Sequence, residues 1–315
     1  MSKLLIQAHK LSRSYGPNLA VKDLSFELQQ GDILGFLGPN GAGKSTTMKM
    51  LAGVLPPSEG QILIDGIDLQ AKPTAAKQKI GYLPEIPPLY PELTVDEYLT
   101  YCGRLRRLTK SQLAGSVELA KQRCGLSGQG SRLTESLSKG FRQRVGIAQA
   151  ILHQPEVVIL DEPTVGLDPN QILEIRKLIT VLGQHHAVIL STHILPEVQA
   201  ICNKVQIINQ GQLVYSSSIH ALNQYKGSSC LIVAFKQAPD ISNLSNEDFI
   251  RDCSAISGNR FRIHVDDIEA AAPKIAELSV KHQWGLLEMM PEASALEQIF
   301  VELTSGETLT GDQAA

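Results

Sequence analysis

A glycine-rich loop follows an apolar run in the N-terminal part of the chain. Residues 38–46 read Gly-Pro-Asn-Gly-Ala-Gly-Lys-Ser-Thr, and residues 33–37 before them read Ile-Leu-Gly-Phe-Leu. This order predicts a strand, a phosphate-binding loop and a helix that begins near Thr46. The loop constrains the fold because it has to join a strand end to a helix start.

Each residue type in the loop suits a nucleotide phosphate, which carries several negative charges. The glycines permit left-handed backbone angles that turn N–H groups inward, Lys44 brings a positive charge, and the Ser45 hydroxyl can bind Mg²⁺. The alternative is a simple tight turn around a solvated lysine, and the flanking strand and helix argue against it. We therefore predict a nucleotide site formed by Gly38, Pro39, Asn40, Gly41, Ala42, Gly43, Lys44, Ser45 and Thr46.

Composition narrows the class of protein. The chain has 315 residues, enough for one large core and a smaller domain, and its net charge is −3. Basic and acidic residues are interspersed, so we expect no nucleic-acid partner. The five cysteines are scattered, which argues against disulfides or a zinc site and favours the reducing cytosol. The sequence lacks a signal peptide and any apolar run of about eighteen residues, so a membrane role would require a partner.

Alternating patterns predict the architecture of the N-terminal part. Short apolar runs alternate with helical patterns, which favours a mostly parallel, doubly wound α/β sheet with an antiparallel β patch near the N-terminus. Prolines between residues 84 and 91 indicate a loop. Thr94 and Glu97 form a capping-box pattern. A mostly helical subdomain should therefore run from about 94 to 153 within a first domain of residues 1–225.

The remaining residues, 226–315, predict a small α+β domain. Residues 226–229 read Lys-Gly-Ser-Ser and indicate a linker. The pattern then predicts strands at 230–235, 261–265 and 286–290, helices at 246–253, 267–282 and 295–303, and a frayed tail from Ser305. This part offers no set of side chains typical of catalysis or metal binding.

Two carboxylates follow a second apolar run. Residues 157–160 are Val-Val-Ile-Leu, and Asp161 and Glu162 come next. At the carboxyl end of a parallel strand, Asp161 could hold Mg²⁺ and Glu162 could orient or deprotonate a water molecule. The alternative is that both only begin a turn before Pro163. A phosphate loop in the same chain favours the catalytic interpretation.

The pattern of apolar runs also locates His193 and Ser138. His193 follows the apolar residues 187–190, so it should reach the same sheet edge and contact a γ-phosphate, although a lone histidine there is more often structural. His185 and His186 precede that strand and are predicted to be solvated. Ser138 should cap the helix that ends near His153, leaving donors for a second anion site; the alternative is a simple N-cap.

Taken in order, these motifs resemble the nucleotide-binding subunit of an ATP-binding-cassette (ABC) transporter across residues 4–225. The loop at 38–46 resembles the Walker A motif, residues 157–162 Walker B, residues 166–168 the D-loop, and His193 the switch histidine. The resemblance implies the P-loop NTPase fold, with ATP and Mg²⁺ as cofactors and Glu162 and His193 as catalytic residues. It further implies that Tyr15 stacks on adenine and that Ser138, Gly140 and Asp168 contact ATP.

Two motifs depart from the family pattern. Residues 137–141 stand where the family has Leu-Ser-Gly-Gly-Gln, but Lys139 replaces the first glycine and Phe141 replaces the glutamine. Residues 81–85 resemble the Q-loop, with Glu85 in place of glutamine. This substitution keeps an oxygen for Mg²⁺, so Glu85 joins Ser45 and Asp161 as a predicted metal ligand, and it adds negative charge near the γ-phosphate.

The resemblance also implies a function. Together with the Ala293–Phe300 segment, the signature is similar to bacterial exporter ATPases of the drug-resistance and gliding-motility kind. Such cassettes form a homodimer around two ATP molecules and bind integral membrane permease subunits at the cytoplasmic face of the inner membrane. The loop after Glu85, with Leu89 and Tyr90, would receive a permease helix; packing within the helical subdomain is the alternative.

Two other functions compete with transport. The first is a regulatory module that closes on ATP with little hydrolysis, because Glu85 or the altered signature weakens catalysis. The second is an ABC ATPase that serves nucleic acid, and the sequence disfavours it because it contains neither a coiled-coil insert nor a second cassette.

Overall fold

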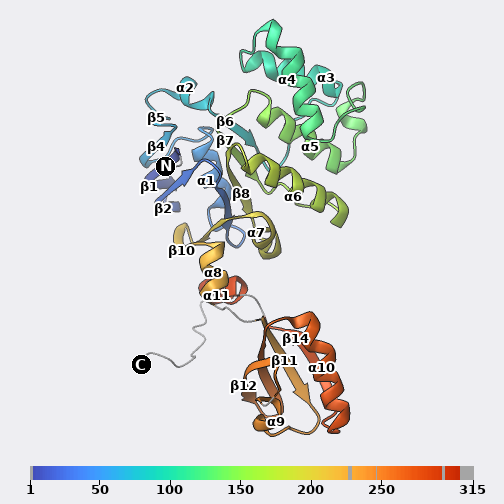
Figure 1. Cartoon of the computed structure of the whole chain (residues 1–315). Coiled ribbons are helices and arrows are strands. Elements are labelled where there is room, and N and C mark those ends of the chain that lie inside the picture. The colour runs from blue at the N-terminus through green and yellow to red at the C-terminus, as the bar shows by residue number, and fades with distance from the viewer. Residues whose placement is uncertain (1–2, 226–228, 246, 293–294, 306–315) are drawn as a thin grey trace. The chain divides into compact units, whose positions relative to one another are not determined.

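The computed structural model describes residues 3–225, 229–245, 247–292 and 295–305. The chain divides into two compact units, which we describe separately (Figure 1). Among the described residues, the first unit runs to Ile219 and also includes Glu302–Ser305, and the second lies within His220–Val301. None of the described helices is both long and apolar enough to cross a membrane.

A six-stranded sheet forms the centre of the first unit. Five neighbouring strands are parallel, and β10 adds an antiparallel edge through a hairpin with β9. The strand order is β10 (Gln212–Ser218), β9 (Lys204–Asn209), β3 (Ile33–Leu37), β8 (Ala187–Thr192), β7 (Val157–Asp161) and β6 (Ile80–Leu83). Every residue of β3, β7 and β8 is buried. Such continuous apolar runs are typical of strands covered on both faces.

An antiparallel sheet packs beside the parallel one. Its order is β2 (Asn18–Gln29), β1 (Leu4–Tyr15), β4 (Glu59–Ile64) and β5 (Ile67–Asp68). Buried side chains of both sheets belong to one hydrophobic cluster, in which the ring centroids of Phe26 and Phe36 lie 6.3 Å apart. The predicted antiparallel patch is therefore confirmed, and its core is continuous with that of the parallel sheet.

Helices complete the first unit. Those that connect the strands are α1 (Lys44–Leu51), α2 (Pro73–Lys77), α6 (Pro169–Gly183) and α7 (Leu195–Ile201). The segment predicted to be helical contains α3 (Val95–Leu105), α4 (Lys110–Arg123), the 3₁₀ turn Thr134–Ser136 and α5 (Lys139–Ile151), which form one green group in Figure 1. The predicted capping box at Thr94 and Glu97 is present at the start of α3.

The second unit is a split βαβ fold. Its antiparallel sheet has the order β12 (Ile250–Ser257), β13 (Arg260–Val265), β11 (Ser229–Phe235) and β14 (Leu286–Pro291). With α9 (Ile241–Ser245) and α10 (Ile268–Lys281), the chain order is β-α-β-β-α-β, as in ferredoxin-like domains. Ala271, Ile275 and Leu278 of α10 join the buried face of the sheet. The last helix is α11 (Ala295–Ser305), and near its end the Leu303 carbonyl accepts a hydrogen bond from the Asn209 side chain of β9.

One predicted helix is wrong, and one hairpin was not predicted. The helix expected at 246–253 is wrong, because Ile250–Ser257 form β12. A bulge between Ile250 and Asp252 leaves Ile250 and Cys253 as the buried pair, three residues apart, and this spacing imitates a helix. The β9–β10 hairpin lies outside the predicted strands, and its turn residues Gln210 and Gly211 both have positive φ. The linker was predicted at 226–229, but Ser229 begins β11; residues 226–228 lie outside the described residues. The frayed tail was predicted from Ser305, but Ser305 ends α11; the residues after it lie outside the described residues.

Candidate nucleotide-binding site

The phosphate loop connects β3 to α1 and needs glycine at two positions for steric reasons. Gly43, the N-cap of α1, has φ of 105°, and a Cβ there would lie 2.6 Å from the Ala20 carbonyl oxygen. A Cβ on Gly38 would lie 2.5 Å from the Ile208 carbonyl oxygen. The backbone of neighbouring strands thus lies against the loop at both glycines. Any side chain at these positions would push the loop backbone away from its phosphate-binding conformation.

Lys44 folds back across this loop. Its Nζ donates hydrogen bonds to the carbonyl oxygens of Gly38 at 2.7 Å and Pro39 at 3.1 Å. The same atom lies 3.8 Å from Glu162 Oε1, and the Lys44 side chain is only 6% exposed. Burial lowers the pKa of Lys44, and the nearby carboxylates of Glu162 and Asp161 oppose that shift. The ammonium is therefore held in place before any phosphate reaches it.

Ser45 and Asp161 bring two oxygen atoms together at the start of α1. Ser45 Oγ donates to Asp161 Oδ1 at 3.1 Å, and Ser191 Oγ donates to the same oxygen at 2.6 Å. Ser191 also accepts a hydrogen bond from the Glu162 backbone N–H at 3.0 Å. Sequence reasoning missed Ser191, although its place beside His193 at the end of an apolar strand was an available signal. This serine orients both carboxylate residues of the Walker B-like motif.

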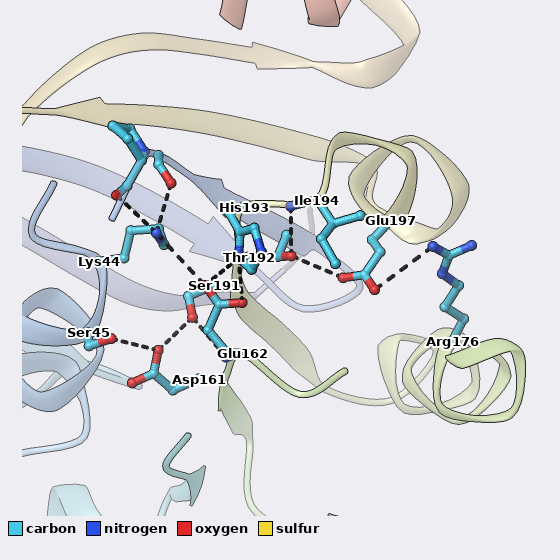
Figure 2. A network of polar contacts seen from close by, with 12 residues as sticks. Lys44, Ser45, Asp161, Glu162, Arg176, Ser191, Thr192, His193, Ile194 and Glu197 are labelled. Atoms are coloured by element: carbon cyan, nitrogen blue, oxygen red, sulfur yellow. Dashed lines mark hydrogen bonds and ion pairs between the residues drawn. The ribbon is translucent and has the colours of Figure 1, made fainter. Parts of the chain in front are cut away.

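Glu162 is held between a lysine and a histidine (Figure 2). His193 Nδ1 lies 3.1 Å from Glu162 Oε2 and 3.3 Å from Oε1, the oxygen that faces Lys44. Burial raises the pKa of Glu162, while the hydrogen bond from His193 and the charges of His193 and Lys44 counteract part of that rise. Glu162 also has φ of 49°, a left-handed conformation that is uncommon outside glycine and that accumulates at functional sites.

These groups line a cavity of about 480 Å³. Its wall includes Asn40, Gly41, Gly43, Lys44, Ser45, Thr46, Glu85, Glu162 and His193. Most of the predicted phosphate, metal and catalytic residues thus meet in one place. Within the described residues no three carboxylate, histidine or cysteine side chains converge closely enough to hold a metal. Mg²⁺ would suit the hydroxyl of Ser45 and the carboxylate of Asp161, because it usually keeps several waters and phosphate oxygens as ligands.

The other predicted ligand residues lie outside the wall of this cavity. Tyr15, at the end of β1, is 46% exposed, and the Arg13 guanidinium lies 5.0 Å from its ring centroid. Ser138 caps α5, where its Oγ accepts a hydrogen bond from Phe141 N at 3.4 Å. Asp168 caps α6 by accepting from Gln171 N at 2.9 Å. These three residues therefore do not line the nucleotide cavity of their own chain.

The starts of α5 and α6 instead lie against each other. A Cβ on Gly140 would lie 2.6 Å from the Gln171 side chain, and the Lys139 ammonium packs against Gly166. A second cavity of about 410 Å³ lies nearby, lined by Glu85, Lys139, Arg142 and the loop residues Ile86, Pro87 and Leu89, among others. Tyr90 is 45% exposed and packs edge-on against Tyr101, with ring centroids 5.6 Å apart.

His186 corrects one prediction. It is 6% exposed rather than solvated, and its Nδ1 lies 2.6 Å from the Pro155 carbonyl oxygen. His186 lies directly before β8 and contacts the segment between α5 and β7, which contains Pro155. The local sequence pattern does not reveal this contact. His185 is exposed, as predicted.

Comparison with known proteins decides the family. The ABC transporter family model matches residues 21–165. The linearmycin resistance ATP-binding protein LnrL of Bacillus subtilis (strain 168) is 32% identical over 312 residues, which cover 97% of this chain and 99% of that protein. The chain belongs to the ABC transporter ATP-binding family. It is accordingly an ATP-binding cassette, and members of this family hydrolyse ATP.

Other relatives agree with this ABC assignment. The bacitracin transport ATP-binding protein BcrA of Bacillus licheniformis is 32% identical and covers 97% of this chain and 99% of its own length. A solved structure described as the ATP-binding subunit of an ABC transporter matches with a TM-score of 0.64 at 30% identity, covering 71% of this chain and 93% of that one. The predicted ABC cassette fold is confirmed.

Proposed function

We propose that this ABC cassette binds and hydrolyses ATP to drive export through separately encoded membrane permease subunits. The observation that carries the proposal is the placement of Glu162, whose buried carboxylate lies between Lys44 and His193 at the wall of the nucleotide cavity. The names of two full-length relatives, in linearmycin resistance and bacitracin transport, favour export as the process served.

Each residue has a part in the proposed hydrolysis. Loop N–H groups and Lys44 bind the phosphates, and the Ser45 hydroxyl and the Asp161 carboxylate hold Mg²⁺, which neutralises phosphate charge when bound. Glu162 orients and deprotonates the attacking water. His193 holds the Glu162 carboxylate in position and can donate to the γ-phosphate. Glu85, on the same cavity wall, is a further proposed ligand for the metal or its waters.

We further propose that the working form is a homodimer. Support comes from Ser138, Gly140 and Asp168, which lie at the adjoining starts of α5 and α6 and outside the wall of the cavity of their own chain. A second copy would use these residues, with Tyr15 of the first copy on the adenine, to complete each ATP site. ATP then joins two chains, because its γ-phosphate satisfies donors on both.

The proposed organisation assigns residues 1–225 to the cassette, with a helical subdomain at about 94–153, and residues 226–315 to an accessory domain. Exposed apolar side chains of the loop after Glu85 support a permease contact there; Ile86 is 80% exposed and Tyr90 45%. Such a contact would place the protein at the cytoplasmic face of the inner membrane, attached through the permease.

One observation favours a second candidate function. Glu85 lines the same cavity as Glu162, so two carboxylates would face a γ-phosphate that is itself negative. This repulsion suits a regulatory module that closes on ATP and turns over little. Steady-state ATP hydrolysis distinguishes the two functions.

The test compares ATP turnover, with Mg²⁺ present, between wild type, Glu162→Gln and the control Glu59→Gln. Glu59 is exposed on β4 and is not among the residues that line the nucleotide cavity, so its substitution should leave the rate unchanged. Transport coupling predicts turnover in wild type and the control and none in Glu162→Gln. A wild type that binds ATP without turnover, even with its permease, would support the regulatory module.

A further inference from the structure

A carboxylate that is not part of the nucleotide cavity wall is buried with incomplete pairing. Glu197, on α7, is 1% exposed. Its Oε2 accepts a hydrogen bond from Thr192 Oγ1 at 3.0 Å, whereas its Oε1 has no hydrogen-bond partner among the described residues. A buried charge of this kind is costly unless it is paired and hydrogen-bonded, and an apolar residue would fill the space without that cost. The presence of a carboxylate here therefore calls for a reason other than packing.

Thr192 connects this carboxylate to the proposed catalytic histidine. The Thr192 hydroxyl donates to Glu197 and also accepts a hydrogen bond from the Ile194 backbone N–H at 3.1 Å. The Thr192 hydroxyl therefore bonds the backbone on the far side of His193, as in a Ser/Thr turn, and also bonds Glu197. These two bonds fix the turn that carries His193. Because His193 Nδ1 is 3.1 Å from Glu162, the orientation of this turn determines how the imidazole meets the Glu162 carboxylate.

The counter-ion for Glu197 comes from another helix. Arg176 Nη2, on α6, lies 3.9 Å from Glu197 Oε1, and Arg176 Nε is also buried without a hydrogen-bond partner in the described part of the chain. A charge-assisted hydrogen bond is about 1 Å shorter, at roughly 2.7–2.9 Å. A small shift between α6 and α7 would therefore change the strength of this pair. Helix α6 begins at its N-cap Asp168, the residue of the D-loop-like turn.

We propose that Glu197 is a positioning residue for His193, acting through Thr192 with Arg176 as its counter-ion (Figure 2). The network links α6, and through it Asp168, to the Glu162 carboxylate. The inference rests on the proposed function, because it assigns His193 a part in hydrolysis. It adds three residues, Arg176, Thr192 and Glu197, that the motifs alone do not single out.

The first test separates the Thr192 hydroxyl from the shape of the side chain. Thr192→Val keeps the shape and removes the hydroxyl, and Thr192→Ser keeps the hydroxyl. The matched control is Thr180→Val, because within the described residues the Thr180 hydroxyl bonds only the Arg176 backbone carbonyl, one turn earlier in α6. We expect kcat for ATP to fall about 10- to 100-fold in Thr192→Val, with KM within about twofold of wild type. Thr192→Ser should retain most of kcat, and Thr180→Val all of it.

A second readout is independent of turnover. The imidazole NMR resonances of His193, assigned with a His193→Ala variant, should move in Thr192→Val and Glu197→Gln and stay fixed in Thr180→Val. This measurement reports the position of His193 even in a protein without activity. A failure of the proposed function would therefore appear as absent turnover in wild type, while a failure of this inference would appear as an unmoved imidazole.

The third test concerns the ion pair and also serves if Thr192→Val does not fold. Because Glu197 and Arg176 are proposed to act as one unit, Glu197→Gln, Arg176→Gln and the double variant should lower kcat by similar factors. Additive losses, an unmoved His193 imidazole, or a Thr192→Ser variant as impaired as Thr192→Val would each overturn the proposal. Circular dichroism spectra confirm that each compared variant is folded.

Discussion

The Nζ of Lys44 lies 3.8 Å from Oε1 of Glu162, and the two side chains are only 6% and 9% exposed. The positive charge proposed to bind phosphate and the negative charge proposed to activate water therefore lie next to each other in a nearly buried environment. A phosphate that binds Lys44 competes with Glu162 for the ammonium, so nucleotide binding and the state of the carboxylate are coupled.

Lys44→Ala tests the phosphate side of this pair. Loss of a charged hydrogen-bond donor to the phosphates should weaken ATP binding about 10- to 100-fold. Isothermal titration calorimetry measures the affinity, and Lys49→Ala is the control because Lys49 lies in the last turn of the same helix and is exposed. An affinity for ATP equal to that of wild type would remove Lys44 from the site.

His193→Ala tests the other side of Glu162. The carboxylate has to be ionised to accept a proton from water, so hydrolysis should fail as the pH drops through its pKa. Burial raises the pKa of Glu162, and the hydrogen bond from His193 lowers it. Removing that bond should move the acidic limb of single-turnover hydrolysis to higher pH. His185→Ala, at an exposed histidine, should leave the limb unmoved; a shift there, or none in His193→Ala, would contradict the assignment.

His153 predicts a dependence of stability on pH. Its Nε2 lies 3.1 Å from the Ile80 carbonyl oxygen, and burial, with a smaller effect of Arg106, lowers its pKa from 6.5 to about 4. A depressed pKa contributes stability that is complete above 6.5 and is lost as the pH falls toward 4. Between those values, wild type should lose about 1–3 kcal/mol more unfolding free energy than His153→Gln. Urea unfolding at several pH values measures this difference, and substitution of the exposed His9 by Gln should not reduce the loss.

Gly81 predicts a packing requirement beneath the Q-loop-like segment. A Cβ on Gly81 would overlap the Ala150 carbonyl oxygen of α5, whereas one on Gly115 of α4 would meet nothing within 4 Å. Gly81→Ala should therefore lower the unfolding free energy by about 1–3 kcal/mol. Gly115→Ala should instead raise it by about 1 kcal/mol, because alanine favours a helix more than glycine does. Equal stabilities of the two variants in urea would show that β6 and α5 do not pack so closely.

The motifs near the phosphate were predictable because each is short and contiguous. The glycine pattern determines the loop around Lys44, and the parallel strands β3, β8 and β7 then bring their carboxyl ends together with Ser45, Asp161 and His193. The register Asp161↔Ser191 depends on strand pairing between distant segments. The place of Ser191 at the end of an apolar strand could be read from the sequence, but its hydrogen bonds with Asp161 and Glu162 depend on this pairing.

Other features depended on tertiary context. The bulge at Ile250 gave a strand the spacing of a helix, and the buried state of His186 depends on the Pro155 carbonyl of another segment. The Arg176–Glu197 pair joins α6 and α7 through charged residues that have no local pattern to distinguish them from solvated ones. Composition and periodicity do not contain this information.

The most direct test of the account is the molecular mass of Glu162→Gln in solution with ATP and Mg²⁺, compared with wild type under the same conditions. If Glu162 activates water within a closed pair of cassettes, the variant should bind ATP, fail to hydrolyse it, and remain a dimer that retains the nucleotide, while wild type returns to monomers as ATP is consumed. Hydrolysis by Glu162→Gln at the wild-type rate, or a variant that binds ATP and stays monomeric, would contradict the account.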